Sequence, residues 1–342
     1  MTPQELTNKI LAYARQLGFP LAGIAIPGPM ASFPVYEEWV GKGHAEGMGY
    51  LSRPDTLEKR ADSARVLPSA RSVLVVGMPY YAQAIEGIQP EQTGHGKVAA
   101  YAWGADYHDV IPARLQELAD WIGEWVDEPF EYRIYTDTGP ILERELAMEA
   151  GLGWIGKNSC LVNPKHGSYF LLAEMFLSLE LVPENPNQIQ DHCGGCQRCI
   201  DACPTSCILP NRTIDARRCI SYQTIENKGE IDPQVGMAAG DQFFGCDLCQ
   251  QVCPWNRRFS TWSADPGLRT NPVTRSVDLV QLLATEDAEI KARFAGSPLS
   301  RAKPYGLKRN ALNVLGNQMA LKNDQNGYEH QTGIKDNGTN NV

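Results

Sequence analysis

A cysteine-rich stretch between Cys193 and Pro254 most constrains what this chain can fold into. It opens as CGGCQRCIDACP, with cysteines at 193, 196, 199 and 203, and it closes as GCDLCQQVCPWN, with cysteines at 246, 249 and 253. One more cysteine, Cys219, lies between these two runs. Cys-x2-Cys-x2-Cys-x3-Cys-Pro spacing is typical of bacterial ferredoxins that hold two [4Fe–4S] clusters. The sequence therefore predicts two cubane clusters.

The spacing also predicts how the cysteines divide between the clusters. A Cys-x2-Cys-x2-Cys loop can cover three corners of one cube, and the cysteine three residues later reaches the other cluster. We assign the first cluster to Cys193, Cys196, Cys199 and Cys253, and the second to Cys203, Cys219, Cys246 and Cys249. The second run lacks one nearby cysteine of the ferredoxin pattern, and Cys219 is the predicted replacement. Cys160 is predicted to be a buried thiol, and Cys207 is left without a role near the cluster.

Other uses of these cysteines fit less well. Zinc sites favour two Cys-x2-Cys pairs on a knuckle, not a triple run, and disulfides need an oxidising compartment. The N-terminal MTPQELTNKI has no apolar signal core or twin arginine, and no run approaches the roughly 18 apolar residues of a membrane helix. We therefore expect a cytoplasmic protein with metal-bound cysteines and no membrane partner.

Outside the cysteines, strand and helix patterns alternate over residues 20–150, which predicts an α/β layer domain. Helices are expected at 3–17 (behind a Thr2–Glu5 capping box), 36–51 (helix and loop), 111–126, 141–150, 277–284 and 309–321. Strands are expected at 21–26, 72–78, 98–103, 131–135, 159–163 and 168–181, with a loop at 82–97. The glycines of Gly151–Gly156 follow a helix, not a strand, which excludes a Rossmann nucleotide site.

These patterns divide the chain into four parts. The predicted bounds are 1–182 for the α/β domain, 183–262 for a ferredoxin-like two-cluster domain, 263–322 for a short helical region and 323–342 for a polar, disordered tail. Clusters alone only store and pass electrons, so the α/β domain is expected to hold an electron acceptor, a second cofactor or both.

Asp137 is the best candidate for an acid in the α/β domain. It follows a predicted strand and precedes a predicted helix, a place where open α/β folds bind ligands. The alternative is that Asp137 only caps the helix, since Asp is a good N-cap and Pro140 marks a first turn. The residue pattern leaves these two interpretations equally open. For Arg60, composition alone favours a surface salt bridge.

Several long motifs resemble the epoxyqueuosine reductase family. They are LEKRADSARVLPSARSVL (57–74), VAAYAWGADYHDV (98–110), YTDTGPILERELAMEAGLGWIGKNS (135–159), the first cysteine run, CISYQTIENKGEI (219–231), FFGCDLCQQVCPWN (244–257) and FAGSPLSRAKPYGLKRNALNVLGNQ (294–318). Together they span most of residues 57–318. Longer family members continue into further helical repeats, whereas this chain runs into a polar tail after Leu321.

The resemblance implies an enzyme that reduces the epoxide of epoxyqueuosine at the tRNA wobble position to queuosine. It implies a flavin-reductase-like α/β domain that holds cobalamin with its base off the metal, fed by the two clusters. Opening the epoxide needs an acid at the departing oxygen, and the resemblance gives this role to Asp137, with a raised pKa in a dry pocket. The expected cobalamin contacts are Arg60, Asp137, Asn158, Ser221, Cys246 and Asp247.

The implied partners are a tRNA and a small electron carrier. A net charge of −9 argues against a generic nucleic-acid binder, so positive charge must be local. The candidates are Arg217-Arg218, Arg257-Arg258, Lys303 and Lys308-Arg309, any of which can also be plain solvated surface. A flavodoxin or ferredoxin is the expected electron donor, and a monomer is expected. The alternatives are a corrinoid and iron–sulfur reductive dehalogenase, or a ferredoxin-like electron-transfer module.

Overall fold

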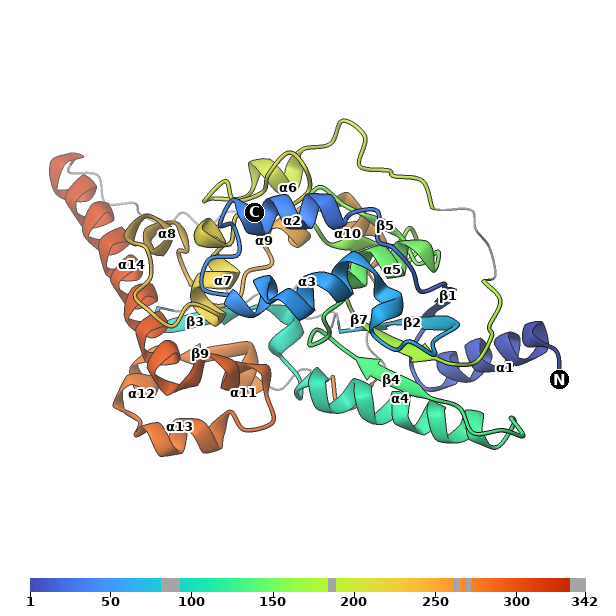
Figure 1. The fold of residues 1–342 in the computed structure, drawn as a ribbon. Coiled ribbons are helices and arrows are strands. Elements are labelled where there is room, and N and C mark those ends of the chain that lie inside the picture. The colour runs from blue at the N-terminus through green and yellow to red at the C-terminus, as the bar shows by residue number, and fades with distance from the viewer. Residues whose placement is uncertain (81–92, 184–188, 261–264, 269–271, 333–342) are drawn as a thin grey trace, which may run out of the picture.

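The computed structural model describes residues 1–80, 93–183, 189–260, 265–268 and 272–332 (Figure 1). Its N-terminal part is built on a four-stranded antiparallel sheet in the order β1-β2-β7-β4. The strands are β1 (Leu21–Ala25), β2 (Ser72–Pro79), β4 (Tyr132–Tyr135) and β7 (Phe170–Leu177). Strands β2 and β7 are central and lie almost wholly in the interior, because both faces of the sheet are covered.

Alternate residues of β2 face two separate hydrophobic cores, as the two-residue period of a strand requires. Leu74, Val76 and Met78 pack with the apolar faces of α1 (Pro3–Gln16) and α4 (Tyr107–Gly123). Val73 and Val75 pack instead with α5 (Glu143–Glu149). The predicted layered architecture is therefore present. However, the sheet is antiparallel, so the ligand-binding rule for parallel sheets does not explain where Asp137 lies.

A second, three-stranded sheet joins segments that the sequence places in three different domains. Its order is β8-β3-β9, with β3 (His95–Val98) pairing in parallel with β8 (Gln242–Phe244) and antiparallel with β9 (Ser276–Asp278). The same core that covers β2 also contains Phe243 and Val277. The α/β part, the cysteine-rich part and the C-terminal part therefore share one core and one sheet.

The cysteine-rich and C-terminal parts consist of short helices and turns followed by one long helix. In the cysteine-rich part these are α6 (Arg198–Asp201), η5 (Ala216–Arg218), α7 (Ile220–Ile225), α8 (Pro233–Ala238), α9 (Leu248–Gln251) and α10 (Pro254–Phe259). The C-terminal part has α11 (Pro272–Arg275), α12 (Leu279–Ala284), α13 (Asp287–Arg293), η6 (Pro298–Ala302) and α14 (Lys303–Thr332). Within the described ranges, no helix is long and apolar enough to cross a membrane.

Several local predictions need correction. The strand expected at 98–103 ends at Val98 and gives way to a 3-10 turn, η4 (Ala100–Ala102), because the Ala100 amide donates to Asp247 Oδ2 at 2.6 Å. The strand expected at 159–163 shrinks to β6 (Leu161–Val162), which pairs with β5 (Trp154–Ile155), not with β7. Residues 276–278, expected to be helical, are strand β9.

The structure confirms the prediction for the N-terminal helix but not the one for the C-terminal tail. The capping box is present, since Thr2 Oγ1 accepts from the Glu5 amide and Glu5 accepts from the Thr2 amide. At the other end, α14 continues through Thr332 into the tail expected to be disordered. Once a helix is nucleated, each added residue extends it at little cost. Most of the loop expected at 82–97, and residues 333–342, lie outside the described residues.

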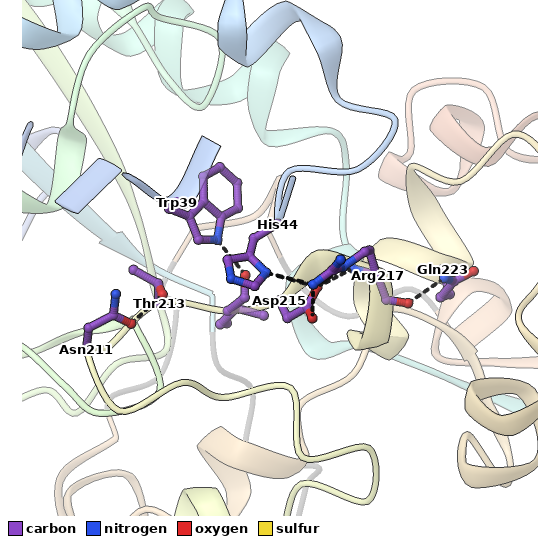
Figure 2. Close-up of polar contacts among 8 residues, drawn as sticks. Trp39, His44, Asn211, Thr213, Asp215, Arg217 and Gln223 are labelled. Carbon is purple, nitrogen blue, oxygen red and sulfur yellow. Dashed lines mark hydrogen bonds and ion pairs between the residues drawn. The ribbon is translucent and has the colours of Figure 1, made fainter. Parts of the chain in front are cut away.

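The segment after β1 is tied to the cysteine-rich part (Figure 2). It contains α2 (Phe33–Gly41), η1 (Gly49–Ser52), α3 (Pro54–Ala61) and η2 (Ser63–Arg65). Trp39 Nε1 donates to the Ile214 carbonyl at 2.7 Å, and Arg217 Nη2 lies 3.0 Å from His44 Nδ1. Arg217 also makes a two-pronged ion pair with Asp215, so this tRNA-contact candidate already has partners inside the protein.

Arg309 was a second tRNA-contact candidate, and the structure contradicts that interpretation. Its side chain is buried, and its guanidinium donates to the backbone carbonyls of Asn227 (2.8 Å), Gln223 (2.7 Å) and Gly229. Arg309 therefore anchors α14 to the segment after α7. Its neighbour Lys308 points the other way and pairs with Asp287 at 2.8 Å.

We expect Arg309→Met to lower the free energy of unfolding by about 3 kcal/mol or more. Removing the guanidinium leaves three carbonyls without their donor, and each buried unsatisfied group costs about 1–3 kcal/mol. Anaerobic urea unfolding followed by circular dichroism measures the change. Lys308→Met is the matched control and should cost less than about 1 kcal/mol, as expected for a partly exposed ion pair. Equal effects of the two substitutions would contradict the anchoring role.

Candidate active site

The four cysteines assigned to the first cluster line one cavity. This cavity of about 270 Å³ is bordered by Cys193, Cys196, Cys199 and Cys253, together with Lys157, Trp255 and other residues. Burial raises the pKa of the Cys253 thiol, and the nearby Cys193 and Cys196 raise it further. The structure thus brings Cys253, from the second motif, to the three cysteines of the first motif. Their role as iron ligands remains a prediction.

Local hydrogen bonds shape this cavity. The Cys196 amide donates to the Cys193 carbonyl at 2.9 Å, which closes a tight turn with Gly194 at a φ of 46°. Lys157 Nζ donates to the carbonyls of Gly194 (2.8 Å) and Cys196 (2.9 Å). Trp154 Nε1 lies 3.5 Å from Cys193 Sγ. The β5–β6 hairpin, which carries Trp154 and Lys157, therefore packs against the first cysteine loop and holds its backbone.

The second cysteine group is more enclosed and contains an additional thiol. Burial, together with the neighbouring Asp247, Cys219 and Cys203, raises the pKa of the Cys246 thiol to about 12. Burial, and then the neighbouring Cys160, Cys246 and Cys219, raise the pKa of Cys249. Cys207 Sγ lies 3.4 Å from Cys203 Sγ, and a hydrogen bond from Cys207 lowers the pKa of Cys203 to about 4. Sequence spacing did not reveal this contact.

Asp137 lies on the turn after β4, in an uncommon backbone conformation. Its φ is 53°, and its amide donates to Glu143 Oε1 at 2.8 Å. The Tyr107 hydroxyl donates to Asp137 Oδ2 at 2.8 Å, and His108 Nε2 is 3.9 Å from the same oxygen. Helix α5 begins after Leu142, which is its N-cap, so the helix-cap interpretation of Asp137 is wrong.

The Asp137 side chain is 63% exposed, so the protein alone does not enclose it in the dry pocket that was expected. It adjoins a second cavity, of about 390 Å³. The residues that line it are Tyr101, Asp106, Tyr107, His108, Glu226, Lys228, Pro298, Ser300, Arg301 and Lys303. Aromatic and cationic side chains thus meet beside a carboxylate, which suits a polar, planar substrate that carries negative charge.

Three members of this cavity wall were missed by sequence reasoning. His108 Nδ1 lies 2.7 Å from Asp106 Oδ1, and this hydrogen bond raises the pKa of His108. Tyr107 holds Asp137 directly. The motif AYAWGADYHDV contains all three residues, but they act together with Asp137 only because the start of α4 packs beside the end of β4. Tyr101 lies near both Asp137 and Asp247, because burial and then these two carboxylates raise its pKa.

Two of the predicted cofactor contacts have buried donors without partners. Within the described part of the chain, Arg60 Nε and Asn158 Nδ2 are shielded from solvent and make no hydrogen bond. Arg60 also stacks on the Tyr36 ring at 4.8 Å and approaches the Gly139 carbonyl at 3.5 Å, so the surface salt-bridge interpretation is wrong. A buried polar group without a partner is costly, which suggests that a bound group supplies the acceptors.

The remaining predicted contacts are placed as follows. Asp247 is buried, its carboxylate accepts from the Ala100 amide, and burial raises its pKa to about 6. Cys246 precedes it at the end of the β8 turn. Ser221 lies in the first turn of α7 and is partly exposed, with its carbonyl accepting from Thr224 Oγ1. Asp247, Cys246 and Ser221 therefore lie beside the second cysteine group, whereas Arg60 lies beside the turn that carries Asp137.

Known proteins identify the family. The family model described as "Epoxyqueuosine reductase QueG, DUF1730" matches residues 60–138, and the one described as "4Fe-4S double cluster binding domain" matches residues 192–256. A protein of Alicycliphilus denitrificans named epoxyqueuosine reductase is 37% identical over 94% of this chain and 89% of its own length. This chain belongs to the epoxyqueuosine reductase family.

Solved structures of epoxyqueuosine reductases have the same fold. One, with a tRNA-Tyr epoxyqueuosine-modified stem loop, is 29% identical, with a TM-score of 0.83 over 93% of this chain and 82% of that one. Another, from Bacillus subtilis, is 28% identical, with a TM-score of 0.80 over 98% of this chain and 87% of that one. In that protein the loop of a catalytic aspartate is swung out of the active site.

Near Asp137, this epoxyqueuosine reductase family member has one buried carboxyl group, Glu174, and one half-buried carboxyl group, Glu143. Glu174 on β7 is fully buried, and neither of its carboxyl oxygens has a hydrogen-bond partner among the described residues. Burial raises the pKa of Glu174 well above its usual range, and Glu143 and Asp137 raise it further. Burial and then Asp137 raise the pKa of Glu143 to about 7. Glu174 therefore favours its neutral form beneath the loop that carries Asp137.

We expect Glu174→Gln to flatten the loss of stability as pH rises. An unfolded Glu ionises near pH 4.5, whereas the folded Glu174 stays protonated, so the native state binds more protons above pH 4.5. Stability should therefore fall by up to about 1.4 kcal/mol per pH unit above that value until Glu174 itself ionises. Urea unfolding at pH 5 and pH 8 tests this. Glu180→Gln, at an exposed site, should keep the wild-type slope, and a wild-type slope in Glu174→Gln would contradict the prediction.

Proposed function

We propose that this chain reduces the epoxide of epoxyqueuosine in tRNA, using cobalamin and two [4Fe–4S] clusters, with Asp137 as the proton donor. The chain is an oxidoreductase of the epoxyqueuosine reductase family. The observation that best supports the proposal is the position of Asp137. Its neighbours Tyr107 and His108 line an aromatic and cationic cavity, and Tyr101 in the same cavity wall lies near both Asp137 and Asp247.

The cysteine groups have the donor set that a [4Fe–4S] cluster needs, namely four thiolates around one site. We propose the first cluster on Cys193, Cys196, Cys199 and Cys253, beside the open cavity, and the second on Cys203, Cys219, Cys246 and Cys249. The second group is deeper and closer to Asp247. Electrons from an external carrier would therefore enter at the first cluster and leave from the second.

The chain offers donors to a bound cofactor, because Arg60 Nε on the Asp137 side and Asn158 Nδ2 in the wall of the first cysteine cavity are buried and lack acceptors among the described residues. We propose that these two residues, with Ser221, Asp247 and the Cys246 backbone, hold cobalamin in its base-off form within a flavin-reductase-like domain. When bound, cobalamin supplies a strongly reducing cobalt nucleophile for the epoxide. The same group would cover the exposed face of Asp137 and exclude water from it.

The protein's own contribution to the reaction is to hold and deliver a proton. The Tyr107 hydroxyl fixes Asp137 Oδ2, while the amide-to-Glu143 hydrogen bond fixes the backbone of the turn. A proton given by Asp137 to the epoxide oxygen turns a poor leaving group into a good one. His108, which hydrogen-bonds Asp106, lies within reach to restore that proton. The Bacillus subtilis protein, whose catalytic aspartate loop can swing out, supports a mobile acid at this place.

The substrate is proposed to enter the 390 Å³ cavity as a splayed-out base from a tRNA anticodon loop. Single-stranded loops allow a base to leave the stack and be read by aromatic and charged side chains. Tyr101 and Tyr107 offer ring surfaces, and Lys228 and Lys303 offer positive charge. The epoxyqueuosine reductase solved with a modified tRNA stem loop supports this substrate class. A flavodoxin or ferredoxin donor, a monomer and a cytoplasmic location remain part of the proposal.

Mass spectrometry of tRNA nucleosides tests this function. Epoxyqueuosine-containing tRNA is incubated anaerobically with the enzyme, cobalamin and a strong reductant, and then digested to nucleosides. We expect the loss of one oxygen atom from the modified nucleoside, and no change when cobalamin or reductant is omitted. If enzyme with both clusters and corrinoid left the nucleoside unchanged, the reductive dehalogenase alternative would be favoured. A preparation that binds clusters but no corrinoid would favour the electron-transfer module.

A further inference from the structure

The second cysteine group has five thiols, although a [4Fe–4S] cluster takes four. The fifth is Cys207, which is only 5% exposed. Its Sγ lies 3.4 Å from Cys203 Sγ, and it also contacts the Cys219 sulfur. Its backbone is held in place because the Asp215 amide donates to the Cys207 carbonyl at 2.9 Å. Burial and this backbone hydrogen bond therefore hold Cys207 in place at the second cysteine group.

The geometry fits a hydrogen-bond donor better than an iron ligand. The four ligand sulfurs of a cubane cluster each bind a different iron and point away from one another. Two sulfurs only 3.4 Å apart are too close to bind different irons of one cube, so Cys203 and Cys207 are not both ligands. A second negative thiolate buried against the first would also be unfavourable, whereas a neutral S–H group can donate to it.

We propose that Cys207 remains a thiol and donates an S–H hydrogen bond to the Cys203 ligand sulfur, which raises the reduction potential of the second cluster. This inference rests on the ligand assignment proposed above. Reduction adds one electron to the cluster, and part of the added negative charge falls on the ligand sulfurs. A donor at one sulfur stabilises the reduced form more than the oxidised form, and hydrogen bonds to the sulfurs are known to set cluster potentials.

The position of this donor gives it a function in electron flow. Cys207 adjoins the deeper cysteine group, and no contact to the sulfurs of the first group is recorded for it among the described residues. A higher potential at the second cluster alone favours transfer from the first cluster to the second. The electron would then rest on the side of Asp247 and Tyr101, where the proposed chemistry takes place. Thr205 Oγ1, 3.5 Å from Cys203 Sγ, is a second polar neighbour of the same sulfur.

An anaerobic redox titration followed by electron paramagnetic resonance tests the proposal, with iron analysis of each protein. Wild type, Cys207→Ala and Cys207→Ser should all bind about eight irons, as two clusters require. Cys207→Ala should lower the midpoint potential of one cluster only. A tenfold change in the reduction equilibrium is the expected scale, which for one electron corresponds to about 59 mV. Cys207→Ser keeps a donor and should restore most of the wild-type potential.

Cys160→Ala is the matched control, because Cys160 is half-buried, not buried as predicted, and makes no hydrogen bond to a ligand sulfur in the described part of the chain. It should leave both potentials unchanged. The loss of four irons from Cys207→Ala would make Cys207 a ligand and overturn the proposal, as would unchanged potentials in that variant. Failure of the ligand assignment itself would look different: wild type would hold fewer than eight irons, or Cys203→Ala would keep all of them.

Discussion

Asp137→Asn is expected to lower the rate of epoxyqueuosine reduction by about 10²- to 10⁴-fold, the range for losing a positioned general acid. The amide side chain can still accept the hydrogen bond from Tyr107 but cannot give a proton to the epoxide oxygen. Both clusters should remain, because Asp137 lies on the turn after β4 and is not a cysteine neighbour. Single-turnover nucleoside mass spectrometry of the fully loaded variant measures the effect.

Two further variants make the Asp137 result interpretable. Asp120→Asn changes an exposed carboxylate on α4 that accepts a hydrogen bond from Gln116, and it should retain full activity. Tyr107→Phe removes the hydroxyl that fixes Asp137, and we expect a smaller loss of about tenfold, the size of one hydrogen bond. If Asp137→Asn turned over at the wild-type rate, Asp137 would not be the proton donor and would have only a structural role in the turn after β4.

Cys253→Ala is expected to remove the first cluster and leave the second, although Cys253 belongs to the second sequence motif. The cysteine lines the same cavity as Cys193, Cys196 and Cys199. About four of eight irons should be lost, and electron paramagnetic resonance should show one remaining cluster. Turnover should fall to background when a protein carrier supplies the electrons, because the entry point of the electron path is gone.

Cys219→Ala is the complementary test, since Cys219 is assigned to the second cluster. It should remove the other half of the iron and leave the signal that Cys253→Ala loses. Cys160→Ala should keep all the iron. If Cys253→Ala and Cys219→Ala abolished the same spectroscopic signal, the division of ligands between the two clusters would be wrong.

The comparison of sequence with structure shows where local patterns are sufficient. An uninterrupted apolar run without charges located β2, because a central strand that is covered on both faces needs apolar side chains on both. Local patterns were less reliable where hydrogen bonds to residues far along the chain determine the backbone conformation. The 98–103 segment is apolar like a strand, but hydrogen bonds to Asp247 and Phe244, far along the chain, turn it into a 3-10 helix instead.

The sequence by itself determined that this chain carries ferredoxin-type cysteine motifs, and its motifs indicated the epoxyqueuosine reductase family and Asp137. It could do so because cluster-binding spacing is a property of a short loop and is written in consecutive residues. Only the tertiary structure decided that Tyr107 and His108 adjoin Asp137, that Arg309 points inward, and that Cys207 stands against Cys203. Side-chain partners are set by how helices and strands pack in space, and the spacing along the chain does not contain that information.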